Sequence, residues 1–448
     1  MTDARPAAMG NGAVLRLPAF RKLFAAQTIS NVGDGMTYMA LMLLVNALTH
    51  STAALAVLAI AVAVPSMVGG IVGGAVADRF DRRRIMLASD TARAILVLGF
   101  TVVATADRLP ILYLVAFAQA AIGTLFSPAR GALIPRAVPA EGLMAANGLG
   151  QLSNVVCSLL GTTVTGIVFA LTGSAWPVFI LDAVTFLASV AIVYRVDRAL
   201  GTPSHEAHVA GASFASSVTA GLRVIAASRT LIATLLGLFV AMLGMGAINI
   251  LFVPFLINVL HESPAWVGPV EGAQTLSMVL AAALIGTLAS RFSARSMVVG
   301  GLAGTGVVIA LFSQVPNVWV LFPLAFLVGW FVTPLNAAVS TLVQTTAKDA
   351  MRGRVLGALN AAMSTATIVS TAAAGVFGAA IGIRMVVLIG GLLCIAAAVG
   401  TGVLFWLDGR RVATPAGAAA PTPATLAPET TLLPEATLAR DVALAHEA

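Results

Sequence analysis

Charged side chains are scarce in this chain: only 10% of its 448 residues are Asp, Glu, Lys or Arg, whereas soluble domains carry about 25%. Hydrophobic residues make up 59%, so an ordinary soluble domain is excluded. The net charge of +7 would suggest nucleic-acid binding in a soluble protein. Here the arginines lie in short segments between apolar runs, where membrane topology and anionic lipid account for them. We therefore expect a multi-pass membrane protein with the lipid bilayer, and no nucleic acid, as a partner.

Side chains for covalent, metal or nucleotide chemistry are also few. Cys157 and Cys394 both lie inside apolar runs, which excludes a disulfide framework or a paired-cysteine metal site. The histidines do not have the spacing of metal ligands. The phosphate-binding pattern Gly-x-x-x-x-Gly-Lys-Ser/Thr does not occur. We expect no catalytic residues, no cofactor and no metal, and ATP hydrolysis is not the energy source.

What the chain has in abundance is long apolar runs, and their lengths predict twelve transmembrane helices. A hydrocarbon core of about 30 Å needs roughly 20 helical residues per crossing. The predicted spans are 20–48, 52–77, 84–105, 109–129, 143–171, 175–195, 229–259, 265–290, 295–314, 317–344, 354–380 and 383–407.

The distribution of basic residues supports this count. Every Lys and Arg outside the predicted helices falls on the side of the two termini, except Arg108 and Arg384. Because basic loops stay in the cytoplasm, we expect both termini to be cytoplasmic in the cell (inner or plasma) membrane.

The chain divides into two similar halves. The segment from Gly74 to Arg83 has a diverged copy from Gly286 to Arg295. Parallel six-helix repeats around a cavity are a plan of secondary transporters, in which the halves rock against each other. The expected regions are a cytoplasmic N-terminus (1–19), a six-helix bundle (20–195), a cytoplasmic linker (196–228), a second six-helix bundle (229–407) and a disordered cytoplasmic tail (408–448).

The connection between the second and third predicted helices packs charge and small residues into a short turn. As a gate, Asp78 would pair with arginines or cap a helix of the other half; as a topology signal alone, the arginines would face anionic lipid. Gating is the favoured interpretation, because orientation alone does not require an acid within a basic cluster. The residues of this gating loop are Gly74, Asp78, Arg79, Arg82, Arg83 and Arg84.

These residues resemble the loop signature of the major facilitator superfamily. Four further segments, 126–130, 133–135, 143–147 and 352–355, resemble the branch that contains macrolide, multidrug and siderophore exporters. The resemblance covers about residues 17–407. It implies an all-α membrane fold of twelve helices in two six-helix pseudo-repeats, and commonly a proton-driven exporter of amphipathic compounds.

Two departures from the family pattern limit what the resemblance implies. The fourth-helix motif Arg-x-x-Gln-Gly would place its arginine at position 116, where this chain has Ala116 and retains only Gln119. The fifth-helix antiporter motif is replaced by the stretch from Gly161 to Gly166, in which its proline is missing. Proton coupling by the fourth-helix arginine is therefore absent.

The first predicted helix carries a polar stripe. Gln27, Asn31, Asp34 and Tyr38 follow spacings of four, three and four, which places them on one helical face. A charge inside the bilayer costs about 2.5–3.5 kcal/mol on insertion scales, so Asp34 calls for an explanation. It either binds proton or substrate, or its carboxyl fixes the packing of a neighbouring helix. The flanking glycines are expected to let this helix bend.

Four more charges lie within predicted helices. Asp90 and Arg93, three residues apart, are expected to pair structurally near the cytoplasmic gate. Asp182 and Glu271 are expected near the extracytoplasmic end, within reach of water. Glu271 is the better functional candidate, because Gln274 and Ser277 continue its polar face at a spacing of three. A neutral buried carboxyl can exchange its proton for a cationic or polar substrate.

The sequence thus predicts a transporter that exports small amphipathic molecules by alternating access, with protons as the counter-substrate, acting as a monomer. An importer or uniporter with the same fold is the alternative, because the direction of transport is poorly encoded. Methionines such as Met39, Met42, Met242 and Met245 are expected to fill the core rather than line a pliant binding surface.

Overall fold

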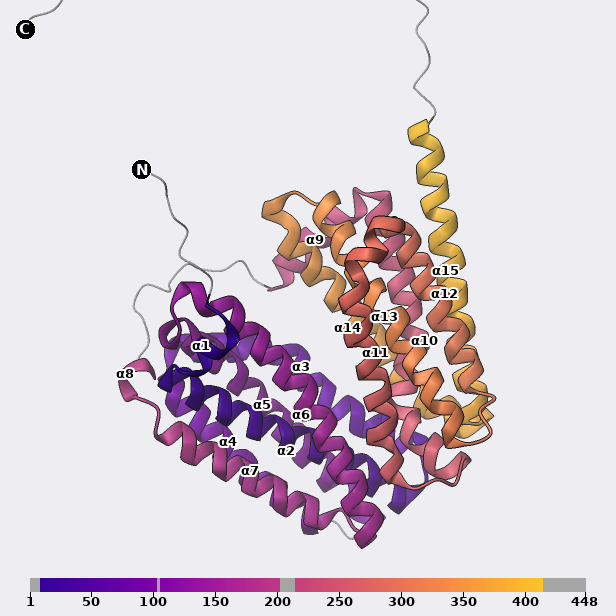
Figure 1. Ribbon diagram of the computed structural model, residues 1–448. Coiled ribbons are helices and arrows are strands. Elements are labelled where there is room, and N and C mark those ends of the chain that lie inside the picture. The colour runs from indigo at the N-terminus through magenta and orange to yellow at the C-terminus, as the bar shows by residue number, and fades with distance from the viewer. Residues whose placement is uncertain (1–8, 103–104, 202–213, 414–448) are drawn as a thin grey trace, which may run out of the picture. The chain divides into compact units, whose positions relative to one another are not determined.

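The computed structural model describes residues 9–102, 105–201 and 214–413; within these ranges the side chains of 67–75, 77–78, 199, 201, 214–218, 349–350 and 409–413 are not described. The chain divides into two compact units, Met1–Asp408 and Gly409–Ala448, and the fold below is that of the first. Every element formed by the described residues is a helix (Figure 1).

Twelve long helices correspond to the twelve predicted spans, which confirms the all-helical membrane fold. Eleven are long and apolar enough to cross a bilayer over their described residues, and α3 has an apolar described stretch, Thr52–Ser66. The long helices are α2 (Pro18–Thr49), α3 (Thr52–Arg79), α4 (Arg82–Gly99), α5 (Leu109–Ala137), α6 (Leu143–Thr172), α7 (Trp176–Tyr194), α10 (Arg229–Pro254), α11 (Val267–Arg291), α12 (Ala294–Phe312), α13 (Val318–Thr346), α14 (Asp349–Ile381) and α15 (Ile383–Ala413).

Short polar side chains start several of these helices. Ser51, Asp81, Ser228 and Asn317 each accept a hydrogen bond from the backbone N–H three residues ahead, at the beginning of α3, α4, α10 and α13. Such caps satisfy amide groups that have no partner within the helix. At the end of α6, Gly173 adopts φ +66°, a conformation that glycine reaches without steric cost.

The packing repeats between the halves. In the first half α2 packs on α6, and α5 packs on α3 and α4; in the second, α10 packs on α14, and α13 packs on α11 and α12. The repeated loop segment follows the same pairing of helices: α3 ends at Arg79, and its counterpart α11 ends at the equivalent residue, Arg291. The predicted internal repeat is therefore confirmed.

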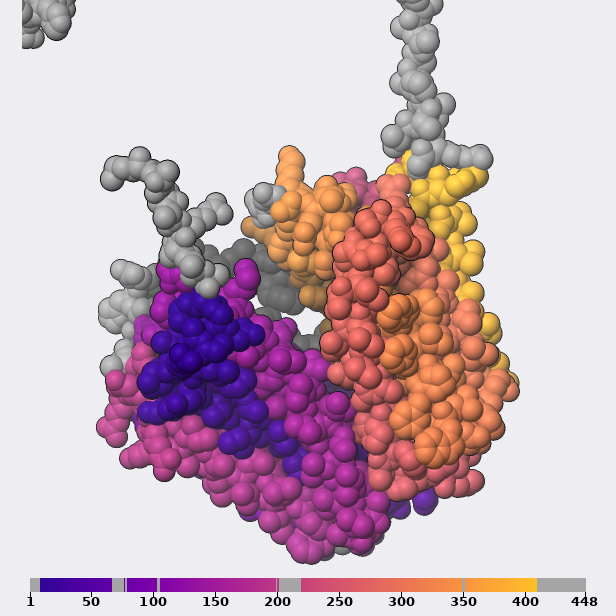
Figure 2. Space-filling model, viewed as in Figure 1, coloured from indigo at the N-terminus to yellow at the C-terminus, as the bar shows by residue number. Residues whose placement is uncertain are grey.

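At one end of the helices the halves contact each other directly. Asn46 of α2 and Asn258 exchange reciprocal side-chain hydrogen bonds of 3.2 and 2.9 Å, and the hydroxyl of Thr52 donates to the carbonyl of Gly375 at 2.8 Å. Gly268 of α11 lies directly against Thr163 of α6. Figure 2 shows the purple surface of α6 meeting the salmon surface of α11, with a hollow beyond this contact. We call this region the closed end.

Asn258 lies in an unusual turn. Pro254 ends α10 and is followed by a π-helical turn, η4 (Phe255–Val259). Proline removes a backbone donor and disfavours a regular α-turn, and π-turns occur frequently at functional sites. The turn places Asn258 opposite Asn46.

Three predicted boundaries differ from the structure. The fourth span is longer than expected, because α5 continues to Ala137 and includes Arg130 and Arg136. The 196–228 linker contains α8 (Arg198–Gly201) and α9 (Phe214–Ala226). Helix α9 packs on α14, where Gly221 lies directly against Arg354 and Ala358. The predicted tail begins six residues early, at 408, since α15 continues to Ala413. Residues 414–448 lie outside the described part.

Candidate functional site

A cavity of about 560 Å³ lies between α2, α5, α6, α10 and α11, with walls from both halves. We call it the central cavity. The whole polar stripe predicted on α2 lines it: Gln27, Asn31, Asp34 and Tyr38. The helical spacing therefore correctly identified the cavity-facing side of α2, while the transport role of these residues stays a prediction.

A cluster of amides holds one end of the stripe in place. The side-chain oxygen of Asn154 on α6 accepts hydrogen bonds from Gln27 Nε2 at 3.0 Å and Asn31 Nδ2 at 2.6 Å. The Arg130 guanidinium of α5 donates to Gln27 Oε1, so α2, α5 and α6 are connected at this point. Asn154 and Arg130 line the same cavity.

Arg130 was missed because its charge was assigned to a loop. In the structure it lies within α5, eleven residues after Gln119 and seven before the helix ends at Ala137. The available signal was the continuing apolar pattern of Leu133 and Ile134, which are both buried.

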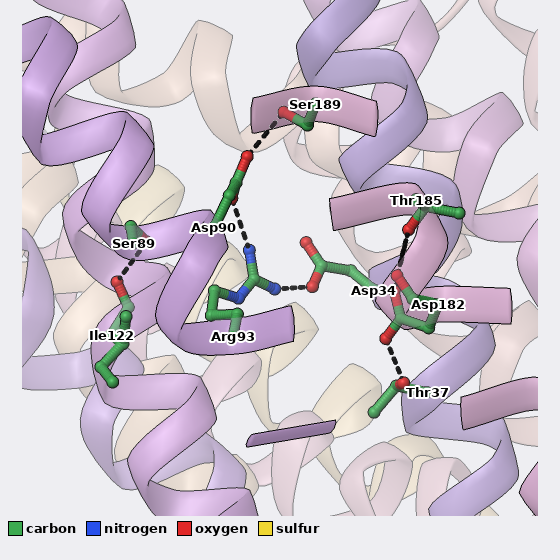
Figure 3. A network of polar contacts seen from close by, with 9 residues as sticks. All are labelled: Asp34, Thr37, Ser89, Asp90, Arg93, Ile122, Asp182, Thr185 and Ser189. Carbon is green, nitrogen blue, oxygen red and sulfur yellow. Dashed lines mark hydrogen bonds and ion pairs between the residues drawn. The ribbon is translucent and has the colours of Figure 1, made fainter. Parts of the chain in front are cut away.

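Asp34 contacts a buried charge network (Figure 3). One guanidinium nitrogen of Arg93 on α4 forms an ion pair with Asp34, and another lies 3.8 Å from Asp90 Oδ1. The expected pairing of Asp90 with Arg93 is present, but Asp34 is the closer partner. The Asp34 side chain is 42% exposed and that of Arg93 only 7%, so Asp34 connects the cavity to the buried network.

The network continues away from the cavity. Ser189 donates to Asp90 Oδ2 at 2.6 Å, and the Arg93 guanidinium lies 4.2 Å from the ring centre of Phe186. Apart from the 3.8 Å ion pair, Asp90 Oδ1 has no hydrogen-bond partner among the described residues. The polar groups of α4 and α7 thus meet inside an apolar core, where such contacts are strong.

Asp182 is not within reach of water, so this prediction was wrong. Its side chain is 0% exposed; it accepts hydrogen bonds from Thr37 of α2 and, at 3.0 Å, from Thr185. Asp182 is buried because Gly33 has no side chain. The Asp182 carboxyl lies directly against the backbone of α2, in the space that a Cβ on Gly33 would fill. Gly33 and Gly35 both lie directly against neighbouring helices, and α2 continues through them as one helix. That they let α2 bend stays a prediction.

Arg93 lies beside Ala116, the position at which the family's fourth-helix motif has its arginine. A small cavity of about 80 Å³ is lined by Asp34, Arg93, Ala116 and Gln119, among others. The cation beside Ala116 in this cavity is therefore Arg93 of α4. Gln119 is buried there, and its Oε1 has no hydrogen-bond partner among the described residues.

Glu271 lines the central cavity and a second cavity of about 290 Å³ within the C-terminal half. Gln274 lies on the second cavity, as the predicted polar face requires, whereas Ser277, which the same spacing predicts, is 0% exposed and donates to the carbonyl of Gln274. Met39 and Met42 are buried in the hydrophobic core, as expected, and they also border the central cavity. Met242 and Met245 line the second cavity.

In the gating loop, the described side chains bond within their own half. Arg83 is buried and donates to the carbonyls of Val193 and Tyr194 at the end of α7. Arg82 donates to the carbonyl of Ala132 at 3.4 Å, while Arg79 and Arg84 are exposed. The side chains of Gly74 and Asp78 lie outside the described part, so the gate stays a prediction.

The second half contains a counterpart to Arg83. Arg295 forms an ion pair with Asp408 at 2.8 Å and donates to Thr230. Both arginines connect the start of the third helix of their half to the end of the sixth. No group of three or more His, Cys, Asp or Glu side chains with metal-binding geometry occurs among the described residues.

Comparison with solved structures identifies the fold. The nucleoside transporter NupG superposes with a TM-score of 0.66 at 14% identity, covering 87% of this chain and 99% of NupG. A bacterial homologue of the human lysosomal transporter Spinster, in an inward-facing and unoccupied conformation, gives a TM-score of 0.67 at 14% identity, covering 88% and 96% of the two chains.

The fold, the family model and the relatives given next together identify a multi-pass membrane transporter of the major facilitator superfamily rather than an enzyme. Within it, the model of the transmembrane secretion effector family matches residues 9–412, and the chain belongs to that family. Among its relatives, the uncharacterized MFS-type transporter YfiS of Bacillus subtilis (strain 168) is 28% identical over 383 residues, 83% of this chain and 90% of YfiS. The enterobactin exporter EntS of Citrobacter koseri is 28% identical over 370 residues, 81% and 86% of the two chains.

Proposed function

We propose that this transporter exports small amphipathic molecules across the cell membrane in exchange for protons, as a monomer with both termini in the cytoplasm. Likeness to an enterobactin exporter favours export, and a cavity with polar and apolar walls favours amphipathic substrates. The observation that carries the proton exchange is Asp34, which lines the cavity and forms an ion pair with the buried Arg93.

The charge balance of the network supports proton binding. Three carboxyl groups lie in this region, those of Asp34, Asp90 and Asp182, beside the single guanidinium of Arg93. Arg93 forms ion pairs with Asp34 and Asp90, whereas Asp182 accepts hydrogen bonds from Thr37 and Thr185. Unbalanced charge within the bilayer costs about 2.5–3.5 kcal/mol per group on insertion scales, so bound protons would restore neutrality. Asp34 is the member that a proton from the cavity reaches.

In the proposed step, a proton binds a carboxylate oxygen of Asp34 and weakens its ion pair with Arg93. The guanidinium then interacts mainly with Asp90, whose Oδ1 lies 3.8 Å away. Substrate leaves and the proton enters while the cavity opens outward; the proton is released when it opens to the cytoplasm. Protonation thus changes a contact between α2 and α4, which can bias the equilibrium between the two open states.

The closed end supports loading from the cytoplasm. With cytoplasmic termini, as the basic residues predict, Asn46, Asn258 and Thr52 lie on the outer side of the bilayer. The central cavity would then receive its substrate from inside the cell before the halves rock.

The test is substrate-induced proton movement in energised everted vesicles that contain the chain. A panel of lipophilic drugs, siderophores and polar nutrients is added while a fluorescent dye reports luminal pH. Proton release upon addition of a drug or siderophore, absent from vesicles without the chain, supports antiport. If correctly inserted protein gives no proton response to any compound, proton-coupled export is contradicted, and a uniporter or importer becomes the better account.

A further inference from the structure

Arg130 is a cation on the cavity wall without an acidic partner. Among the described residues, Asp34, Asp90 and Asp408 pair with Arg93 or Arg295 and not with Arg130. The hydrogen bond described for the Arg130 side chain goes to the neutral amide oxygen of Gln27. A guanidinium in this position retains donors for a further acceptor, and its planar fork matches carboxylate, sulfate or phosphate groups.

We propose that the central cavity selects amphipathic anions, with the anionic group on Arg130 and the apolar body toward the closed end; this inference rests on the proposed function. The surroundings of Arg130 are polar and preorganised. Asn154 fixes the amides of Gln27 and Asn31, and Ser127 lines the same wall. These groups can donate further hydrogen bonds to an oxyanion without introducing a competing negative charge.

The opposite end of the cavity is suited to an apolar body. Met39, Met42 and Phe252 line it, and Phe252 also borders the second cavity, where Met242 and Phe312 extend the apolar wall. Methionine side chains adapt to varied apolar shapes. A ligand that displaces water from these walls gains about 25 cal/mol for each Å² of apolar surface buried.

Distance along α2 limits the length of the ligand. Gln27, which contacts Arg130, and Tyr38 are eleven residues apart in one continuous helix, or about 16 Å at 1.5 Å per residue. A molecule that uses both regions therefore has its anionic group and its apolar body on an extended frame. A compact polar anion would contact Arg130 alone and bind weakly.

The position of the Glu271 carboxyl is compatible with this placement. Glu271 lies near the start of α11 and shares the wall of the second cavity with Asn249 and Gln274, and Arg130 lies near the opposite end of α5, seven residues before Ala137. An oxyanion on Arg130 therefore lies at the other end of the cavity from the Glu271 carboxyl. The two groups instead orient the ligand, because the anionic end avoids Glu271.

The experiment compares two probes that differ only in charge: 4-(pyren-1-yl)butyrate and its carboxamide. Calorimetric titrations use the full chain in phosphatidylcholine nanodiscs, with empty discs subtracted and no proton gradient. We expect the native chain to bind the carboxylate more tightly than the carboxamide. Arg130→Gln should weaken carboxylate binding by about ten- to a hundredfold, the range for hydrogen bonds to charged groups, and leave carboxamide binding nearly unchanged.

Two variants keep the test decisive. Arg130→Lys retains the charge and should keep part of the carboxylate preference, whereas Arg136→Gln removes a cation of the same helix that is not among the lining residues and should keep all of it. Equal binding of the two probes by the native chain, or unchanged carboxylate binding in Arg130→Gln, overturns the proposal. Because binding is measured without transport, this failure is distinguishable from a failure of proton-coupled export.

Discussion

The reciprocal amide pair at the closed end should hold the halves together, and removing one member should favour opening. Asn46 and Asn258 are 212 positions apart, the same offset as between Asp81 and Ser293, which begin α4 and α12. They are therefore equivalent residues of the two repeats that contact each other. The perturbation is Asn258→Leu, which removes both hydrogen bonds of the pair.

The expected magnitude follows from the burial of Asn46, which is 2% exposed. Each lost hydrogen bond costs about 0.5–1.5 kcal/mol net, and a buried amide left without a partner costs about 1–3 kcal/mol. Opening lets water satisfy Asn46, so the variant should favour the outward-open state by about 1–3 kcal/mol, or 5- to 150-fold. Asn46→Leu combined with Asn258→Leu should shift the equilibrium less than Asn258→Leu alone, because no amide is then left unpaired.

Distances between spin labels measure this equilibrium. Thr172, at the end of α6, and Gln314, after α12, are both exposed and belong to different halves. The native Cys157 and Cys394 are buried, so labels react at cysteines introduced at the two exposed sites. The population with the longer distance should increase in Asn258→Leu.

Asn147→Leu is the matched control, because Asn147 is exposed near the start of α6 and should leave the distances unchanged. The reasoning is refuted if Asn258→Leu gives the native distance distribution. It is also refuted if the double variant shifts the equilibrium by the sum of the two single shifts.

Two further predictions concern packing within the halves. A Cβ on Gly161 would lie 2.5 Å from a backbone oxygen of α2, whereas one on Gly148 meets nothing within 4 Å; Gly161→Ala should therefore destabilise the protein by about 1–3 kcal/mol, and Gly148→Ala should not. Thermal unfolding in detergent measures both, and equal midpoints would contradict the packing argument. Arg83→Gln should lower the free energy of unfolding by about 1.5–3 kcal/mol, because its carbonyl partners lose their charged donor. Arg84→Gln, at an exposed position, should change it by no more than about 0.5 kcal/mol. Similar losses for the two variants in the same assay would contradict the structural role of Arg83.

The helices and the repeat could be predicted because they depend on local patterns. Apolar run lengths located all twelve long helices, and the 212-residue offset relates Asp81 to Ser293 in the structure. The polar stripe from Gln27 to Tyr38 was predictable for the same reason, since helical period alone determines which residues share a face.

The charge network could not be predicted, because it depends on which helices touch. Arg93 has a local partner in Asp90, but the closer contact is with Asp34 on another helix. Asp182 is buried by α2, whose Gly33 carries no side chain to hold the helices apart. The position of a residue along its own helix reveals neither the contact of Arg93 with Asp34 nor the burial of Asp182 against α2.

The amide pair was within reach of the sequence, and Arg130 was lost through one assumption. Aligning the halves at the repeat offset places Asn46 opposite Asn258, a coincidence of two polar residues in apolar runs. Arg130 was placed outside the membrane because basic residues were taken to mark loops, although α5 continues past it. Topology rules describe where charges are usual and therefore miss the functional exceptions.

The most direct test of the central claim separates substrate movement from proton coupling at Asp34. With a substrate identified in the vesicle panel, Asp34→Asn is compared with Asp107→Asn, which alters an exposed acid of the short turn η2 (Ala106–Arg108). We predict that Asp34→Asn abolishes proton-driven uphill transport but retains exchange of labelled for unlabelled substrate without a gradient, and that Asp107→Asn retains both. Uphill transport by Asp34→Asn at the native rate would contradict the account.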